Sequence, residues 1–336
     1  MKILYVGMKY DYGNPNKGFS FEHYNFYESL VTMEEGKHKI VYFPFDEIMN
    51  EKGREVMNTE LIEEVHREKP DLCFFILFTD EIHRETITML KTVYPETTTF
   101  NWFADDHWRF DNFSKYYAPY FDFVSTTDSW APRKYARIGY THVLKTQWAC
   151  NTLVYTPISS AQLRYNVTFV GQPHSDRKEV AETIKNAGID FRCWGNGWPN
   201  GRVNQKEMIR IFSESRINLN LTKGSGAINM KQVGKIFLNR RVNDTYQWYP
   251  PTRWIENFIS LWNKRREQIK GRNFEIPGCG GFLLTADADN LKDYYEDGKE
   301  IVVFKDVPDL IEKARYYLTH ESERARIARA GYERTL

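Results

Sequence analysis

Short apolar runs of strand length alternate with helix-like segments along the whole chain, and this alternation limits the possible folds most strongly. Strands that are separated by helices form parallel sheets, and helices then cover both faces of each sheet. The strand candidates are residues 3–6, 38–43, 72–78, 97–103, 123–126, 143–146, 167–170, 191–194, 217–221, 282–284 and 301–304. The sequence therefore predicts an α/β protein built on doubly wound parallel sheets.

The alternation is interrupted once, in residues 149–163, which have no clear periodicity and contain Pro157, Ser159 and Ser160. A chain of 336 residues suits two domains of ordinary size. We therefore expect a Rossmann-like domain over residues 1–150, a linker over 151–164 and a second Rossmann-like domain over 165–336. In such sheets, ligands bind at the carboxyl ends of the strands, so a cleft between two facing domains is expected.

Composition excludes several classes of protein. The 46 Lys and Arg residues nearly cancel the 45 Asp and Glu residues, so a chain-wide field that recruits nucleic acid is not expected. The four cysteines are far apart, which indicates a reducing compartment and no zinc site. The N-terminus reads as a strand, and no apolar window reaches membrane-spanning length. We expect a cytoplasmic protein without a transmembrane segment.

Residues 223–268 form a long insertion that is rich in aromatic and basic side chains. One interpretation is an ordinary helical insertion whose aromatic rings pack on the second domain. The other is an element that binds the acceptor or a partner, because sugars stack on aromatic rings and acidic groups attract cations. The aromatic residues are Trp248, Tyr249, Trp254, Phe258 and Trp262, and the cations are Lys231, Lys235, Arg240, Arg241, Lys264, Arg265 and Arg266.

A run of cations, one acid and small residues precedes an apolar strand in residues 270–285. Lys270 and Arg272 supply positive charge for a diphosphate, and Gly280 and Gly281 let a ligand approach the main chain. Glu275 is either an acid that interacts with a helix dipole or an acceptor for the two hydroxyls of a ribose. Together these residues favour a nucleotide or nucleotide-sugar pocket.

Two further loops follow predicted strands of the second domain. Gly171 and Arg177 frame the loop after the first of these strands, where a doubly wound domain meets phosphates, although Arg177 also suits a solvated position on a first helical turn. Trp194 and Gly195 follow the next strand. They either form a wall of the base pocket or belong to a tight turn flanked by packed tryptophans.

The first domain has its own group of polar residues at strand ends. Asp105 and Asp106 directly follow an apolar strand and precede a histidine. Adjacent acids repel each other, which favours either a general base with a sugar-orienting acid, or a helix cap beside a solvated acid. Side chains expected on the acceptor side are Tyr10, Tyr12, His107 and Asp128. No third ligand stands at a suitable spacing, so a metal is not expected.

The block of residues 268–285 resembles the donor-site signature of CgeB-like (spore-maturation type) glycosyltransferases, which are related to family 4 (group 1) glycosyltransferases. Residues 294–304 and 328–334 resemble the same family, as do residues 102–106, 126–128 and 147–151 in the first half. The resemblance covers nearly the whole chain. The long aromatic insertion and the end of the chain at Leu336 depart from the family pattern, in which the last helix returns to the first domain.

The resemblance implies a GT-B fold whose second domain binds a nucleotide-sugar, with a UDP-sugar expected as the substrate, no metal and no cofactor. Glu275 matches the acid that holds the ribose, and Arg177, Lys270 and Arg272 match the diphosphate clamp. Asp105 and Asp106 fall where such enzymes contact the transferred sugar or activate the acceptor.

These observations predict a hexosyltransferase-like enzyme that transfers a sugar to a glycan, a protein or a small molecule. Retention of the anomeric configuration is favoured, and Asp105 or Asp106 is the expected base if the reaction inverts. Two alternatives are a nucleotide-sugar epimerase or hydrolase on the same fold, and a non-catalytic protein of surface-layer assembly. Transfer to DNA is disfavoured by the near-neutral charge. The sequence does not indicate the oligomeric state.

Overall fold

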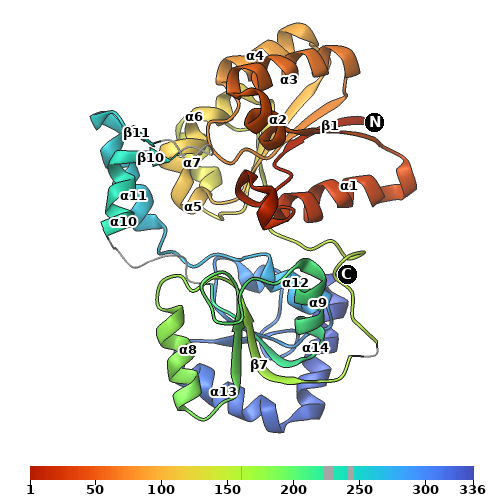
Figure 1. The fold of residues 1–336 in the computed structure, drawn as a ribbon, viewed down its shortest axis with the longest axis vertical. Helices are drawn as coiled ribbons and strands as arrows, with labels where there is room; N and C mark the ends of the chain where they lie inside the picture. The colour runs from red at the N-terminus through yellow and green to blue at the C-terminus, as the bar shows by residue number, and fades with distance from the viewer. Residues whose placement is uncertain (160, 223–229, 241–245) are drawn as a thin grey trace. The chain divides into compact units, whose positions relative to one another are not determined.

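The computed structural model describes residues 1–159, 161–222, 230–240 and 246–336, and it divides into two compact units (Figure 1). The first unit comprises Met1–Gln147 and Ile228–Asn263, and the second comprises Trp148–Ala227 and Lys264–Leu336. Each unit contains a parallel sheet that is covered by helices. The predicted α/β class is therefore confirmed.

The sheet of the first unit has six parallel strands in the order β2-β1-β3-β4-β5-β6. Its strands are β1 (Lys2–Gly7), β2 (Lys39–Pro44), β3 (Leu72–Phe75), β4 (Thr98–Phe103), β5 (Phe123–Thr126) and β6 (Val143–Lys145). Its helices before the insertion are α1 (Glu28–Thr32), α2 (Phe45–Lys52), α3 (Arg54–Glu68), α4 (Arg84–Val93), α5 (Asp106–Arg109), α6 (Lys115–Tyr117) and α7 (Ala131–Arg137). All six predicted strands are present.

Successive side chains of β1 point to opposite faces of this sheet, as they must in a strand. Leu4 and Val6 are fully buried in the larger hydrophobic core. Tyr5 lies on the other face, where its ring is 6.0 Å from that of Tyr27. Tyr27 belongs to a π-helical segment, His23–Tyr27, that continues into α1. Burying each such side chain contributes about 1.5–3 kcal/mol, so both faces of the strand stabilise the sheet.

The sheet of the second unit has five parallel strands in the order β13-β12-β9-β7-β8. Its strands are β7 (Tyr165–Val170), β8 (Phe191–Trp194), β9 (Ser215–Asn220), β12 (Leu283–Ala286) and β13 (Val302–Phe304), and its helices are α8 (Arg177–Asn186), α9 (Gln205–Ser213), α12 (Arg272–Gly278), α13 (Val307–Thr319) and α14 (Glu321–Thr335). Read from β8, the order is second, first, third, fourth, fifth, which is also the order of the first five strands in the first unit.

The segment predicted as a linker, residues 151–164, belongs to the second unit, which begins at Trp148. Tyr155 is almost completely buried in the hydrophobic cluster that includes Phe274 and Ile276 of α12. The thiol of Cys150 lies 3.5 Å from the carbonyl oxygen of Phe274. Residues 151–164, which were predicted to be a linker because they lack periodicity, are therefore held in place by packing against α12.

The insertion was expected within the second domain, but residues 228–263 are grouped with the first unit. Its described elements are α10 (Met230–Phe237), β10 (Leu238–Arg240), β11 (Tyr246–Trp248) and α11 (Trp254–Asn263), whereas Arg241 lies outside the described residues. Polar contacts explain the grouping. Glu256 of α11 accepts a hydrogen bond from the hydroxyl of Tyr116 at 2.6 Å and pairs with the ammonium of Lys115 at 2.9 Å.

Helix α11 reverses the usual arrangement of an amphipathic helix, because its polar side is the buried one. Asn257 and Ser260 are buried, and the side-chain amide of Asn257 bonds to Asn112 at 3.1 Å and to the carbonyl oxygen of Ile236 at 2.9 Å. Ile255 is 71% exposed and Phe258 is 55% exposed. These apolar side chains of α11 therefore stay outside the core of the first unit, and their packing on the second domain stays a prediction.

Candidate functional site

Two arginines meet at the carboxyl end of β7, the first strand of the second unit. Arg272, the first residue of α12, donates from Nε to the carbonyl oxygen of Val170 at 3.2 Å. Its guanidinium also forms an ion pair with Glu275, one turn further along the helix. The backbone of β7 and the carboxylate of α12 thus hold the guanidinium in one place.

Glu275 is completely buried, and both of its carboxylate oxygens have protein partners. One accepts a hydrogen bond from the hydroxyl of Tyr155 at 2.7 Å, and the other pairs with Arg272. These contacts let Glu275 position Arg272, and the predicted binding of ribose by Glu275 stays a prediction. Tyr155 was missed because it stands in the segment that was predicted to be a linker.

Arg177, at the start of α8, bridges the loops after β7 and β9. Its guanidinium donates to the carbonyl oxygens of Gln172 at 2.9 Å and Leu221 at 2.6 Å. These strands lie side by side where the order of the sheet reverses, the usual binding position in such folds. Burial, with a smaller contribution from the positive charge of Arg272, lowers the pKa of Arg177 to about 10, whereas the charge of Asp176 opposes this shift. The two cations are therefore within electrostatic range of each other.

The neighbouring loops pack closely around this cation pair. The amide of Gly171 donates to the carbonyl oxygen of Trp194 at 2.8 Å. Gly195 has a φ of 139°, and a Cβ there would overlap the carbonyl oxygen of Gly171. Trp194 itself is buried against Tyr165, with ring centroids 5.3 Å apart. Its indole therefore packs in the core and is not exposed as the wall of a base pocket.

The remaining residues of the predicted donor motif fall into two groups. A Cβ at Gly281 would lie 2.8 Å from the amide nitrogen of Asn218, and one at Gly280 would lie 3.2 Å from Pro157. Protein atoms, not a ligand, therefore fill the space beside both glycines. Lys270 is half-buried, and its backbone nitrogen donates to the side chain of Asn273 at 3.0 Å. This contact fixes the main chain at the entrance to α12.

In the first unit, three of the predicted site residues are enclosed at the ends of β4 and β5. Asp106 and Asp128 are fully buried, and His107 is nearly so. The hydroxyl of Tyr135 donates to Asp106 at 2.8 Å. Burial, with a smaller contribution from the charge of Asp128, raises the pKa of Asp106 to about 6, although the hydrogen bond from Tyr135 opposes this shift. These side chains are enclosed in the first unit, and the predicted contacts of His107 and Asp128 with an acceptor stay predictions.

Asp105 differs from its neighbour because it is only half-buried. Its carbonyl oxygen accepts from the amides of Trp108 at 3.1 Å and Arg109 at 2.9 Å, so it forms the N-terminal boundary of α5. Desolvation raises the pKa of the half-buried Glu22, and the charges of Asp11 and, less strongly, Asp105 add to this shift. Glu22 is a second acid near Asp105 that the sequence analysis missed, because no strand end or motif marks it.

The two predicted acceptor-side tyrosines lie in the loop after β1. Tyr10 stacks on Phe19, with ring centroids 5.7 Å apart. Tyr12 is half exposed, has a φ of 53°, and meets the edge of Phe78 at 5.8 Å. Phe78 follows β3, so this ring contact joins the loops of two neighbouring strands.

Within the described ranges, no three His, Cys, Asp or Glu side chains are placed to hold a metal ion. Among these same residues, no helix combines the length and the apolar character needed to cross a membrane.

Comparison with known families relates the second half of the chain to sugar transfer. Residues 177–336 match the family model described as "Glycosyl transferase-like". The chain is also 21% identical over 271 residues to the spore protein CgeB of Bacillus subtilis strain 168, an alignment that covers 80% of this chain and 78% of CgeB. These matches confirm the predicted resemblance to CgeB-like glycosyltransferases.

Solved structures confirm the fold. The HepE structure from Anabaena in complex with UDP-glucose has a TM-score of 0.58 at 10% identity, and the alignment covers 100% of this chain and 94% of that one. Sucrose-phosphate synthase from Thermosynechococcus elongatus has a TM-score of 0.59 at 9% identity, with 99% and 94% covered. The protein therefore has the GT-B fold, as predicted.

Proposed function

We propose that this protein, a CgeB-like chain with the GT-B fold, is a glycosyltransferase that moves a sugar from a nucleoside diphosphate to an acceptor. The match of residues 177–336 to a glycosyl transferase-like family supports the reaction class. The UDP-glucose bound in the similar HepE structure supports a UDP-sugar as the donor. The donor is a substrate, and the proposal includes no further cofactor.

The observation that carries the proposal is the pair of arginines at the reversal point of the second sheet. Arg177 and Arg272 are near enough for the charge of Arg272 to lower the pKa of Arg177, and Glu275 pairs with Arg272. Holding like charges together in a partly desolvated loop is unfavourable unless an anion joins them. A diphosphate supplies that anion, and Lys270 stands two residues before Arg272 on the same loop.

In this mechanism, the cations stabilise the negative charge that develops on the leaving diphosphate. Arg177 and Arg272 contribute fixed charge, so the proposal does not need a metal ion. Glu275 acts as a positioning residue, because its carboxylate holds the guanidinium of Arg272. We further propose retention of the anomeric configuration, since the carboxylate of Asp106 is enclosed. If the reaction inverts, the half-buried Asp105 is the better base.

The proposal is tested by measuring the binding of UDP and a panel of UDP-sugars by titration calorimetry. We expect Arg272→Ala to weaken UDP binding by roughly tenfold or more, because charge-assisted hydrogen bonds contribute about 1.5–3 kcal/mol. Arg326→Ala is the matched control, since Arg326 is an exposed arginine of α14 in the same unit. Equal UDP affinity in the wild type, Arg272→Ala and Glu275→Ala would refute the donor site.

An epimerase or hydrolase on the same fold makes a different product from the same donor. Incubating the protein with a UDP-sugar and candidate acceptors, followed by mass spectrometry, separates these cases. A glycosyltransferase gives a glycosylated acceptor and free UDP. An epimerase changes the donor without an acceptor, and a hydrolase gives free sugar.

A further inference from the structure

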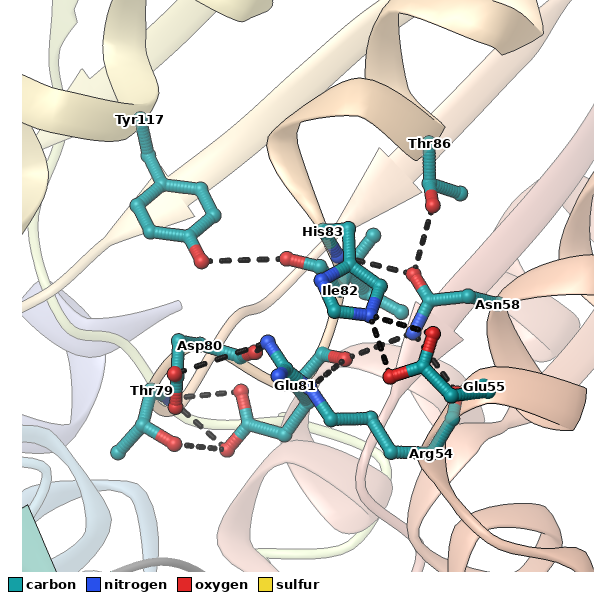
Figure 2. Close-up of polar contacts among 10 residues, drawn as sticks. All are labelled: Arg54, Glu55, Asn58, Thr79, Asp80, Glu81, Ile82, His83, Thr86 and Tyr117. Carbon is teal, nitrogen blue, oxygen red and sulfur yellow. Dashed lines mark hydrogen bonds and ion pairs between the residues drawn. The ribbon is translucent and has the colours of Figure 1, made fainter. Parts of the chain in front are cut away.

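The loop between β3 and α4 of the first unit is held in one conformation by side chains that no predicted motif includes (Figure 2). Glu81 is buried and accepts hydrogen bonds from the backbone amide of Thr79 at 2.7 Å and from its hydroxyl at 2.7 Å. The hydroxyl of Tyr117 donates to the carbonyl oxygen of Ile82 at 3.1 Å. The loop therefore has a fixed shape before any ligand arrives.

Helix α3 fastens the same loop from the other side, as Figure 2 shows. Arg54 donates from Nε to the carbonyl oxygen of Glu81 at 3.1 Å, and its terminal nitrogen reaches the carbonyl oxygen of Asp80. Asn58 donates to the carbonyl oxygen of Glu81 at 3.0 Å and accepts from the amide of His83 at 2.8 Å. The backbone thus fixes the position of the Arg54 guanidinium.

Beside this loop is a cavity of about 200 Å³ whose lining includes three arginines, Arg54, Arg84 and Arg253. Its other walls are formed by two acids, Asp80 and Glu85, and by His83, Tyr116 and Tyr117. Arg253 lies flat over Tyr116, with Cζ 3.9 Å from the ring centroid, so its guanidinium is also fixed. The volume suits a charged group with part of a sugar ring and is small for a whole nucleotide.

Two of the three arginines that line the cavity have a carboxylate within ion-pair distance. Arg54 has the carboxylate of Asp80 at 3.6 Å, and Arg253 has that of Glu256 at 3.5 Å. Arg84 lies over the ring of Tyr120 at 5.7 Å, and no described carboxylate is within ion-pair distance of it. Each guanidinium carries a fork of N–H donors that matches carboxylates and phosphates, and three of them line this one small cavity.

We propose that this cavity binds an oxyanion, either a phosphate or a carboxylate, through Arg84 and Arg253 on a frame set by Arg54. Assigning that oxyanion to the sugar acceptor rests on the proposed function. The loop lies near the candidate base, since Asp105 and Glu81 both raise the pKa of Arg109, which burial lowers. An acceptor held by its oxyanion would then extend from the end of β3 towards the end of β4, the neighbouring strand.

The test titrates the full chain with sodium phosphate, sodium glucuronate and neutral glucose at constant ionic strength, and follows the thermal midpoint. We expect saturable stabilisation by phosphate or by glucuronate, and none by glucose; the anion that binds more tightly identifies the source of the charge. Arg84→Gln should weaken that binding by roughly tenfold or more. Arg133→Gln, an exposed arginine of α7 in the same unit, should leave it unchanged.

Arg272→Ala separates this site from the proposed donor site. Anion binding that survives Arg272→Ala but is lost in Arg84→Gln supports the cavity, even if UDP binding fails. Anion binding that is lost in Arg272→Ala and kept in Arg84→Gln would place the anion in the second unit and overturn the inference. Absence of any anion effect would overturn it as well. Should Arg84→Gln fail to fold, Arg253→Gln gives the same test.

Discussion

The two sheets share one strand order, but acids follow β4 of the first sheet whereas arginines surround the end of β7 in the second. In the first unit, β4 leads into Asp105 and the buried Asp106, whose hydrogen-bond donor is the neutral hydroxyl of Tyr135. In the second unit, β7 ends at Val170, whose carbonyl oxygen accepts a hydrogen bond from Arg272, and Arg177 lies nearby. Topology therefore supplies only the position of a site, whereas the residues of the loops decide whether that site suits a catalytic base or a bound anion.

The two buried acids also differ in how they are balanced. Glu275 has a cation in contact, whereas desolvation dominates at Asp106 and raises its pKa. Removing Glu275 should therefore destabilise the second unit, because Arg272 loses its carboxylate. Raising the pH should destabilise the first unit, because the buried Asp106 then ionises.

The largest expected effect comes from breaking the charge pair of the second unit. Glu275→Ala removes the carboxylate that pairs with the guanidinium of Arg272. Breaking a buried ion pair in this way lowers the unfolding free energy by about 3–5 kcal/mol. Urea unfolding monitored by circular dichroism measures this loss. Glu333→Ala removes an exposed acid that pairs with Arg329 on α14 and serves as the control. Similar urea unfolding curves for Glu275→Ala and Glu333→Ala would show that the Arg272–Glu275 pair does not stabilise the second unit.

The next effect is the pH dependence of the first unit. The folded pKa of Asp106, about 6, exceeds its usual value of 3.8, so the folded state binds more protons between these values and stability falls as pH rises through them. The full loss is on the order of 2–3 kcal/mol. Asp106→Asn has no carboxyl group to ionise at this position, so it should not show this loss. Relative to the wild type, its unfolding free energy should therefore increase between pH 4 and pH 7. A constant difference across this range would contradict the assignment.

A smaller effect is expected when the hydroxyl that faces Asp106 is removed. Tyr135→Phe keeps the buried ring but deletes the hydrogen bond of 2.8 Å, at a cost of about 1–2 kcal/mol. Urea unfolding at pH 7 gives its size. The double variant with Asp106→Asn shows whether the two effects are coupled, and strictly additive losses would argue against the contact.

The smallest effect on stability is expected at the neighbouring acid. Asp105→Asn keeps the size of a half-buried side chain but removes a charge that raises the pKa of Arg109, so its unfolding free energy should fall by about 0.5–1 kcal/mol. If Asp105 contacts the reacting groups, sugar transfer should nevertheless fall, which a product assay measures. Full activity in this folded variant would leave the first unit without its proposed base.

The periodic parts of the chain were predictable from sequence, because their burial repeats. All eleven predicted strands are present, and β5 and β8 have the predicted bounds. Residues fixed by individual polar contacts were not predictable. Tyr155 reaches Glu275 across 120 positions, and Glu256 reaches Tyr116 across 140. Neither contact leaves a periodic signal in the sequence.

Site residues were predicted in location but only partly in role. Asp105 and Asp106 are adjacent in sequence, yet one is half-buried and the other enclosed, because α5 starts between them. Glu275 was singled out for its charge, whereas its contacts with Tyr155 and Arg272 follow from packing. The composition of a loop shows that polar groups gather there, whereas their orientation depends on packing around them.

The insertion also affects the order in which the chain can fold as it is synthesised. Helix α11 completes the polar contacts of Lys115 and Tyr116, although it is made about 140 residues after them. Strands β7, β8 and β9 of the second unit leave the ribosome before α11 does. A domain usually folds as a unit, N-terminal first, but here the first unit must wait for the second to begin. Nascent chains that end before Trp254 should therefore hold an incomplete first unit.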